Sequence, residues 1–111
     1  MMFAGRLIAK GAPVLLALLS FSAMAQTMAD VRIEGYKFVP PEVTIRSGES
    51  VRWVNGEKRT SHSVLFPAEG GRESERMFPD ESWERQFTKP GRYEYTCGPH
   101  PEMKGVVIVV D

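Results

Sequence analysis

Short runs of alternating apolar and polar residues, each closed by a turn signal, are the feature that most constrains the fold of this chain. In the clearest run, Tyr93, Tyr95 and Cys97 fall on one face of an extended segment, with polar residues between them. The segment 106–110 is a continuous β-branched run, which suits a strand buried on both sides. Asn55-Gly56 closes another run and is a strong turn signal. Further strands are expected within residues 31–38, 43–45, 51–53, 62–66 and 83–87.

Seven or so short strands and no convincing amphipathic helix predict an all-β fold, an antiparallel sandwich or barrel. No repeat, linker or low-complexity tract follows residue 25, so we expect a single domain. The segment 69–81 departs from the strand pattern, because it carries five acidic residues, two arginines and two glycines. We interpret it as a solvated connector with at most one short helical turn.

Residues 1–25 have the pattern of a secretory signal peptide rather than of a folded element. Arg6 and Lys10 form a positive region, residues 12–21 are apolar, and Ala23-Met24-Ala25 is a small-x-small cleavage pattern. The apolar stretch is shorter than the roughly 20 residues of a membrane-spanning helix. Arg6 has no arginine neighbour, so we expect Sec-type export to the periplasm and a mature domain of residues 26–111.

Charge and cysteine content restrict the partners. Without residues 1–25 the chain has 12 basic and 14 acidic residues, a net charge of −2, which argues against nucleic acid and anionic membranes as partners. Exported domains of this size often contain disulfides, but one cysteine cannot form an internal bridge. A metal-bound thiolate would account for this unpaired cysteine.

The candidate ligands lie at regular spacing near the C-terminus. Cys97, His100 and Met103 follow one another three residues apart, and His62 is the only other histidine. A thiolate, two imidazoles and a thioether are soft or borderline ligands, which favour copper over magnesium, calcium or manganese. Zinc is the main competitor, but its structural sites use cysteine, histidine or carboxylate, and a thioether is a poor fourth ligand. We therefore predict one copper ion in a blue copper electron-transfer site.

The candidate ligands, and the function of the protein, also have other interpretations. A lone cysteine or methionine is more often a buried apolar residue, and His62 beside serines is compatible with a solvated loop. Together, however, the four residues place every cysteine and histidine of the chain in one ligand set. A copper-delivery protein is the alternative function, although such proteins favour open, methionine-rich sites. A copper oxidase would need further histidines, so no enzyme is expected.

The motif Gly91-x-Tyr93-x-Tyr95-x-Cys97-x-x-His100-x-x-Met103 resembles that of the cupredoxins, and its short last gap is most similar to the amicyanins. The resemblance covers nearly all of residues 26–111. It implies a Greek-key antiparallel β-sandwich of about seven or eight strands and a monomeric periplasmic carrier of single electrons. The implied partners are redox proteins such as a c-type cytochrome or a periplasmic dehydrogenase. By position, His62, Cys97 and His100 would be the equatorial ligands and Met103 the weak axial one.

Two residues depart from the pattern of these relatives. Ser63 stands where many of them have an asparagine whose side chain ties the two ligand loops together. Because serine is shorter, we expect this tie to be weaker or absent. Glu102 stands where amicyanins tend to have an aromatic residue, so the partner of amicyanin does not transfer directly.

Overall fold

A computed structural model describes residues 27–111 of the chain. The expected signal segment, residues 1–25, and its cleavage site lie outside the described residues. Among the residues that are described, no helix is long and apolar enough to cross a membrane.

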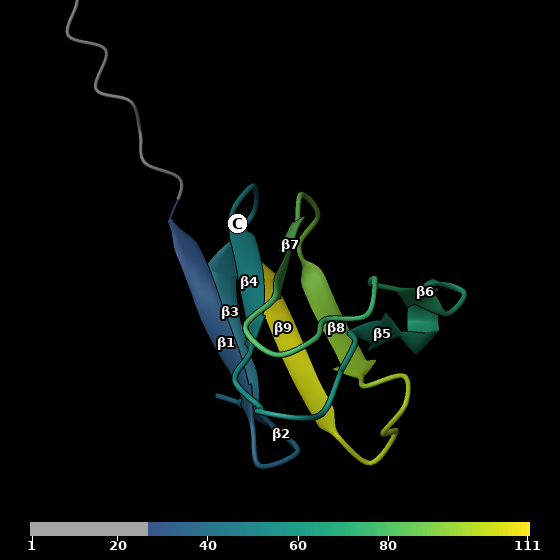
Figure 1. Cartoon of the computed structure of the whole chain (residues 1–111). Coiled ribbons are helices and arrows are strands. Elements are labelled where there is room, and N and C mark those ends of the chain that lie inside the picture. Colours follow the sequence, from purple (N-terminus) through teal and green to yellow (C-terminus); the bar gives the residue numbers. More distant parts are fainter. Residues whose placement is uncertain (1–26) are drawn as a thin grey trace, which may run out of the picture.

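Two β-sheets pack face to face as a sandwich, as predicted (Figure 1). The first sheet has the order β2-β1-β4-β7 and consists of β1 (Met28–Glu34), β2 (Lys37–Val39), β4 (Ser50–Asn55) and β7 (Ser82–Gln86). The second has the order β3-β9-β8-β5-β6 and consists of β3 (Glu42–Arg46), β5 (Leu65–Phe66), β6 (Arg72–Glu73), β8 (Gly91–Thr96) and β9 (Lys104–Val110). The described part of the chain therefore has nine strands, two of them only two residues long.

Both sheets are mixed rather than purely antiparallel. β1 pairs parallel with β4, and β3 pairs parallel with β9, whereas the remaining pairs are antiparallel. Parallel neighbours arise because the chain changes sheet between them, so that strands adjacent in space are not consecutive in sequence. Side chains alternate with a period of two in both kinds of pairing, so the sequence pattern could not distinguish them.

The core lies between the sheets and is built from the predicted alternation. Val31 and Ile33 of β1 are fully buried, as are Trp53 of β4 and Cys97 just after β8. The Trp53 ring lies 5.4 Å from the Tyr95 ring and meets it edge to face. The strand that carries the cysteine is thus fixed by the best-packed part of the molecule.

β9 is an interior strand of its sheet, and Val107 and Val109 are buried, but Val110 is 42% exposed. The expectation of a strand buried on both sides therefore holds only in part, because the outer face of a two-layer sandwich meets solvent.

The segment 69–81 is more ordered than the sequence suggested. A 3-10 helix, η1 (Pro67–Glu69), supplies the short helical turn, and β6 then pairs with β5. Ser74 and Met77 are buried, and Met77 forms a two-way backbone bridge with His62. The interpretation as a solvated connector was therefore wrong for its second half, because that half packs against the strand-like segment that contains His62.

Candidate metal centre

His62, Cys97 and His100 converge at one end of the sandwich, where the β1–β2, β4–β5 and β8–β9 connections meet (Figure 1). One ligand atom from each residue lies within 4.8 Å of the other two. The Nδ1 atoms of His62 and His100 are each 3.6 Å from the Cys97 Sγ atom. This spacing leaves room for one ion bonded to all three atoms at about 2.0–2.3 Å.

The connection between β8 and β9 presents Cys97 and His100 from a hydrogen-bonded loop. The Cys97 N–H donates to the Met103 carbonyl at 3.2 Å, and the Met103 N–H donates to the His100 carbonyl at 2.9 Å. Cys97 directly follows β8 and Lys104 begins β9, so both ends of the loop are anchored in adjacent strands. Met103 is 2 % exposed and packs with the core at the end of this loop.

His62 is held by backbone and side-chain contacts from two directions. Its N–H and carbonyl exchange hydrogen bonds with Met77, at 3.0 and 2.8 Å. The buried Asn55 amide donates to the carbonyls of Thr60 and Met77, at 2.8 and 2.9 Å. β4 ends at Asn55, as the turn signal Asn55-Gly56 predicted, and the Asn55 side chain organises the longer loop that leads to His62.

Burial favours the neutral forms of His62 and Cys97 in the absence of a metal. His62 and Cys97 are completely buried. Burial raises the pKa of the Cys97 thiol, although a hydrogen bond from the Ser63 N–H opposes part of this effect. Burial also lowers the pKa of His62, and the nearby His100 lowers it further. A metal ion that binds here must therefore displace the thiol proton, while the buried imidazole is already neutral.

The donor set and its surroundings fit copper. Two imidazole nitrogens, a thiolate and a nearby thioether suit a soft or borderline ion. The Nε2 atom of His62 is buried and has no hydrogen-bond partner within residues 27–111, but it lies 3.6 Å from the Glu57 carboxylate. If Nδ1 binds the metal, Nε2 carries the proton and faces this carboxylate, which is the usual outer support of a metal-bound histidine.

The two ligand loops are joined through Ser63, so the tie is not absent, which was one of the two outcomes expected from the shorter serine. The Ser63 Oγ accepts a hydrogen bond from the Gly98 N–H at 2.9 Å and donates one to the Glu73 Oε2 at 2.6 Å. The Ser63 N–H also points to the Cys97 Sγ at 3.4 Å. The serine is shorter than asparagine, but a carboxylate from β6 completes the connection. No local sequence signal indicated that Glu73 would reach this site.

Tyr36 is a further neighbour that the sequence analysis missed. Its ring meets those of His62 and His100 edge to face, with centroids 5.6 and 5.0 Å apart. Its hydroxyl lies 3.1 Å from the Thr60 Oγ1. Gly35 and Tyr36 both have positive φ, 57° and 58°, and form the two-residue turn between β1 and β2. The glycine between two apolar runs was the available signal for this turn.

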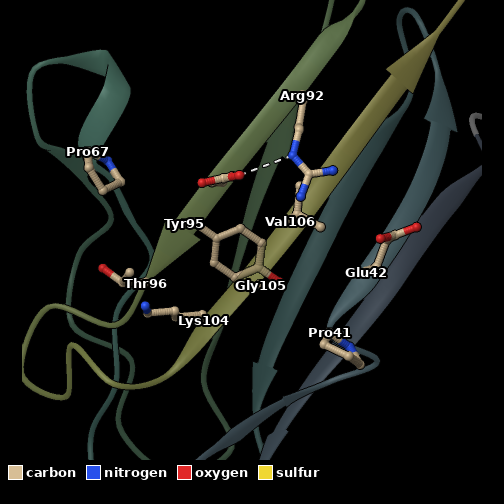
Figure 2. A pocket seen from close by; sticks show the side chains of 10 residues that line it. Pro41, Glu42, Pro67, Arg92, Tyr95, Thr96, Lys104, Gly105 and Val106 are labelled. Atoms are coloured by element: carbon tan, nitrogen blue, oxygen red, sulfur yellow. Dashed lines mark hydrogen bonds and ion pairs between the residues drawn. The ribbon is translucent and has the colours of Figure 1, made fainter.

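A surface hollow of about 430 Å³ lies elsewhere, along the outer side of β8 and β9 (Figure 2). Its walls carry charges of both signs, among them Glu42, Arg92 and Lys104. Arg92 is already paired with Glu94 at 3.1 Å. The hollow includes none of His62, Cys97 and His100, so it is separate from the metal centre.

Comparison with known proteins agrees with this geometry. Residues 25–110 match the family described as copper binding proteins, plastocyanin/azurin family. The chain is 44% identical over 94 residues to the amicyanin of Paracoccus versutus, an alignment that covers 78% of this chain and 70% of the relative. It is 37% identical over 114 residues to amicyanin-alpha of Methylorubrum extorquens, covering 96% and 95% of the two chains.

Comparison with solved structures agrees with the sequence comparison. The crystal structure of amicyanin from Paracoccus versutus matches with a TM-score of 0.69 and 41% sequence identity, covering 78% of this chain and 85% of that chain. The sandwich, the convergent histidine and cysteine side chains and the match along residues 25–110 agree with one another. The chain therefore belongs to the plastocyanin/azurin family of copper-binding proteins, and its similarity is greatest to the amicyanins among the relatives compared.

Proposed function

We propose that His62, Cys97, His100 and Met103 bind one copper ion, and that the protein carries single electrons between redox partners in the periplasm. The observation that carries the proposal is the meeting of two imidazole Nδ1 atoms with one buried sulfur, each 3.6 Å from it. Copper supplies the one-electron chemistry by alternating between Cu(I) and Cu(II). The protein is accordingly an electron carrier and not an enzyme.

The contribution of the polypeptide is to keep the ligands in place. His62 is fixed by its bridge to Met77, and the loop from Cys97 to Met103 is closed by its own backbone hydrogen bonds. Since two different β-sheet connections hold the donors independently of the ion, little rearrangement should accompany a change of oxidation state. A site with this property transfers electrons quickly.

The exposed side of the centre indicates where electrons pass. His62 and Cys97 are fully buried, whereas His100 is partly exposed beside Pro99 and Pro101. We infer that a redox partner, such as a c-type cytochrome or a periplasmic dehydrogenase, docks at this end and exchanges electrons through His100. Such complexes are small and short-lived.

The charge near His100 is mixed rather than simply negative. Glu102 lines a groove together with Lys37 and Lys104, and Tyr36 lies at the same groove. The lysines offset the carboxylate, so Glu102 alone does not select a basic partner. We expect the Glu102→Gln substitution to change the salt dependence of the electron-transfer rate only slightly.

Export to the periplasm is supported by the sequence of residues 1–25, with its positive, apolar and small-residue regions. The proposed mature chain begins at Gln26. An intact-mass measurement on the exported protein tests the cleavage: a mass that includes any of residues 1–25 would contradict it. Absence of the protein from the periplasmic fraction would contradict the localisation.

The central experiment is titration of the metal-free protein with Cu(II). We expect an intense blue absorption from the Cys97 thiolate, and we expect Cys97→Ser to abolish it even if the histidines retain some copper. Thr96→Ser, a change at the neighbouring residue that faces away from the core, is the matched control and should remain blue. A colourless Cu(II) form of the wild type would overturn the proposed site.

A second measurement separates the electron carrier from a copper-delivery protein. The complete burial of His62 and Cys97 favours retention of the ion. We expect reversible one-electron cycling in the presence of a chelator of comparable affinity, with no loss of copper. Rapid transfer of copper to the chelator would instead favour delivery.

A further inference from the structure

We propose that Glu73 is a positioning residue for the metal centre, which fixes Ser63 against Cys97 and lowers the reduction potential of the bound ion. The inference rests on the proposed copper site but concerns residues outside the ligand set. It begins from three hydrogen bonds that meet at Ser63, a completely buried residue.

The Ser63 hydroxyl has one proton, and Glu73 determines where that proton points. The short 2.6 Å contact to the Glu73 Oε2 requires the hydroxyl to donate, because an ionised carboxylate can only accept. The lone pairs of the hydroxyl are then free to accept from the Gly98 N–H at 2.9 Å. Ser63 follows one ligand, His62, and Gly98 follows another, Cys97, so the carboxylate fixes the contact between the two ligand loops.

Gly98 makes room for this carboxylate. A Cβ atom added to Gly98 would collide with the Glu73 Oε2 and would lie 2.7 Å from the Ser63 Oγ. A side chain at position 98 would therefore displace the Glu73 carboxylate and the Ser63 hydroxyl from this arrangement, and glycine leaves the space that they occupy.

The backbone around Glu73 is held by the second sheet. Glu73 pairs with Leu65 of β5, and Leu65 pairs in turn with Thr96, the residue before Cys97. On the other side of Glu73, the Ser74 N–H donates to the Val64 carbonyl at 2.8 Å, and the Ser74 hydroxyl accepts from the Val64 N–H at 2.9 Å. Strand pairing thus places the Glu73 carboxylate at Ser63, and the same pairing supports both ligand loops.

The position of the charge has a redox consequence. The Glu73 carboxylate lies against Ser63 and Gly98, the residues that follow the ligands His62 and Cys97. A negative charge near the bound ion stabilises its more positive, oxidised state and so lowers the potential. Glu73 is an exposed residue, so screening by solvent weakens the effect. Removal of the charge should change the ratio of Cu(II) to Cu(I) affinity by about threefold to tenfold, equivalent to roughly 30–60 mV for one electron.

The test compares Glu73→Gln with Glu75→Gln, which removes the same charge two residues away. Both residues are exposed, so the two variants differ in the contact to Ser63 rather than in burial. Reduction potentials are measured by voltammetry, and exchange of the Gly98 amide proton is measured by NMR in the metal-free protein. We expect Glu73→Gln to raise the potential and to speed exchange at Gly98, and Glu75→Gln to do neither. In a Ser63→Ala background, Glu73→Gln should have a smaller effect on the potential, because the carboxylate is no longer held.

Equal potential shifts in the Glu73 and Glu75 variants would overturn the inference, as would an undiminished Glu73 effect without Ser63. The metal-free amide measurement separates this result from failure of the copper site. If the wild type binds copper without a blue colour, the proposed function fails, whereas the exchange rate at Gly98 still reports whether Glu73 ties the loops.

Discussion

Met103 differs from the other three candidate ligands, because a thioether is neutral and binds weakly. It is almost completely buried at the end of the metal loop, so a leucine of similar volume should be accommodated at a cost below about 1.5 kcal/mol. Met103→Leu removes a donor and should favour Cu(I), which raises the reduction potential on the order of 60 mV, a tenfold change in relative affinity. The blue colour should remain, since the thiolate is unchanged.

Voltammetry and the visible spectrum check this expectation for Met103. A Leu variant with the potential and spectrum of the wild type would show that the thioether is not a ligand. A suitable control is Met77→Leu, which alters another buried methionine that is not in the candidate ligand set. It should leave the potential nearly unchanged.

At the scale of elements, an ion pair joins η1 to β7. The Arg85 guanidinium donates to both carboxylate oxygens of Glu69, at 2.6 and 2.7 Å, and lies over the rings of Phe66 and Phe87 at 4.5 and 4.4 Å. Arg85 is 9% exposed in its side chain and Glu69 is 32% exposed. This bidentate, partly buried pair should contribute more than an ordinary surface ion pair.

We expect Glu69→Gln to lower the free energy of unfolding at pH 7 by about 1–2 kcal/mol. The Arg85 hydrogen bonds lower the pKa of Glu69 in the folded state. The stabilisation is therefore present above the ordinary carboxylate pKa and is lost as the pH falls through the lowered value. Denaturant unfolding at pH 7 and at acidic pH measures both effects, and the variant should lose less stability on acidification than the wild type.

Glu94→Gln provides the matched control, because Glu94 pairs with Arg92 in a contact whose two side chains are 69% and 59% exposed. Its free energy of unfolding should change by no more than about 0.5 kcal/mol. Similar losses of unfolding free energy for the Glu69 and Glu94 variants would show that the η1–β7 ion pair stabilises the fold no more than an ordinary surface ion pair.

The elements also show what sequence can predict. Alternation identified the buried faces of β1, β4 and β8, because inward and outward positions follow directly from the pleat of a strand. It predicted a strand within residues 62–66, where only the two-residue β5 (Leu65–Phe66) forms, and it did not indicate β6, which is too short to show a period. It also could not reveal Glu73 or Tyr36 beside the site, since tertiary pairing brings them there from other parts of the chain.

The candidate ligands were easier to predict than their supports. Cysteine and histidine are so scarce in this chain that their spacing alone suggested a shared site, and the structure brings His62, Cys97 and His100 together. Glutamate and asparagine are common surface residues, so nothing in the sequence marked Glu73 or Asn55 as supports of a metal loop, and only the resemblance drew attention to Ser63. Their roles depend on which loops become neighbours in the sandwich.

At the scale of the whole molecule, the ion and the core stabilise different parts of the fold. The core cluster includes both Cys97 and Met103, and the metal loop is closed by hydrogen bonds that need no ion. The metal-free protein should therefore remain folded, unlike a small domain whose structure depends on its metal. Copper should add stability by cross-linking the β4–β5 loop to the β8–β9 loop, which are far apart in sequence.

Removal of copper by a chelator should consequently lower the melting temperature while leaving the β-sheet circular dichroism signal at 25 °C unchanged. Binding to the folded state alone stabilises it by about 4 kcal/mol when free copper exceeds the dissociation constant a thousandfold, and any binding to the unfolded chain reduces this gain. The difference in melting temperature should shrink in acid, because copper must displace the Cys97 thiol proton, and burial raises the pKa of that thiol. Cys97→Ser should show little dependence of melting temperature on copper. Loss of the β-sheet signal in metal-free protein at 25 °C would show instead that the sandwich requires the ion to fold.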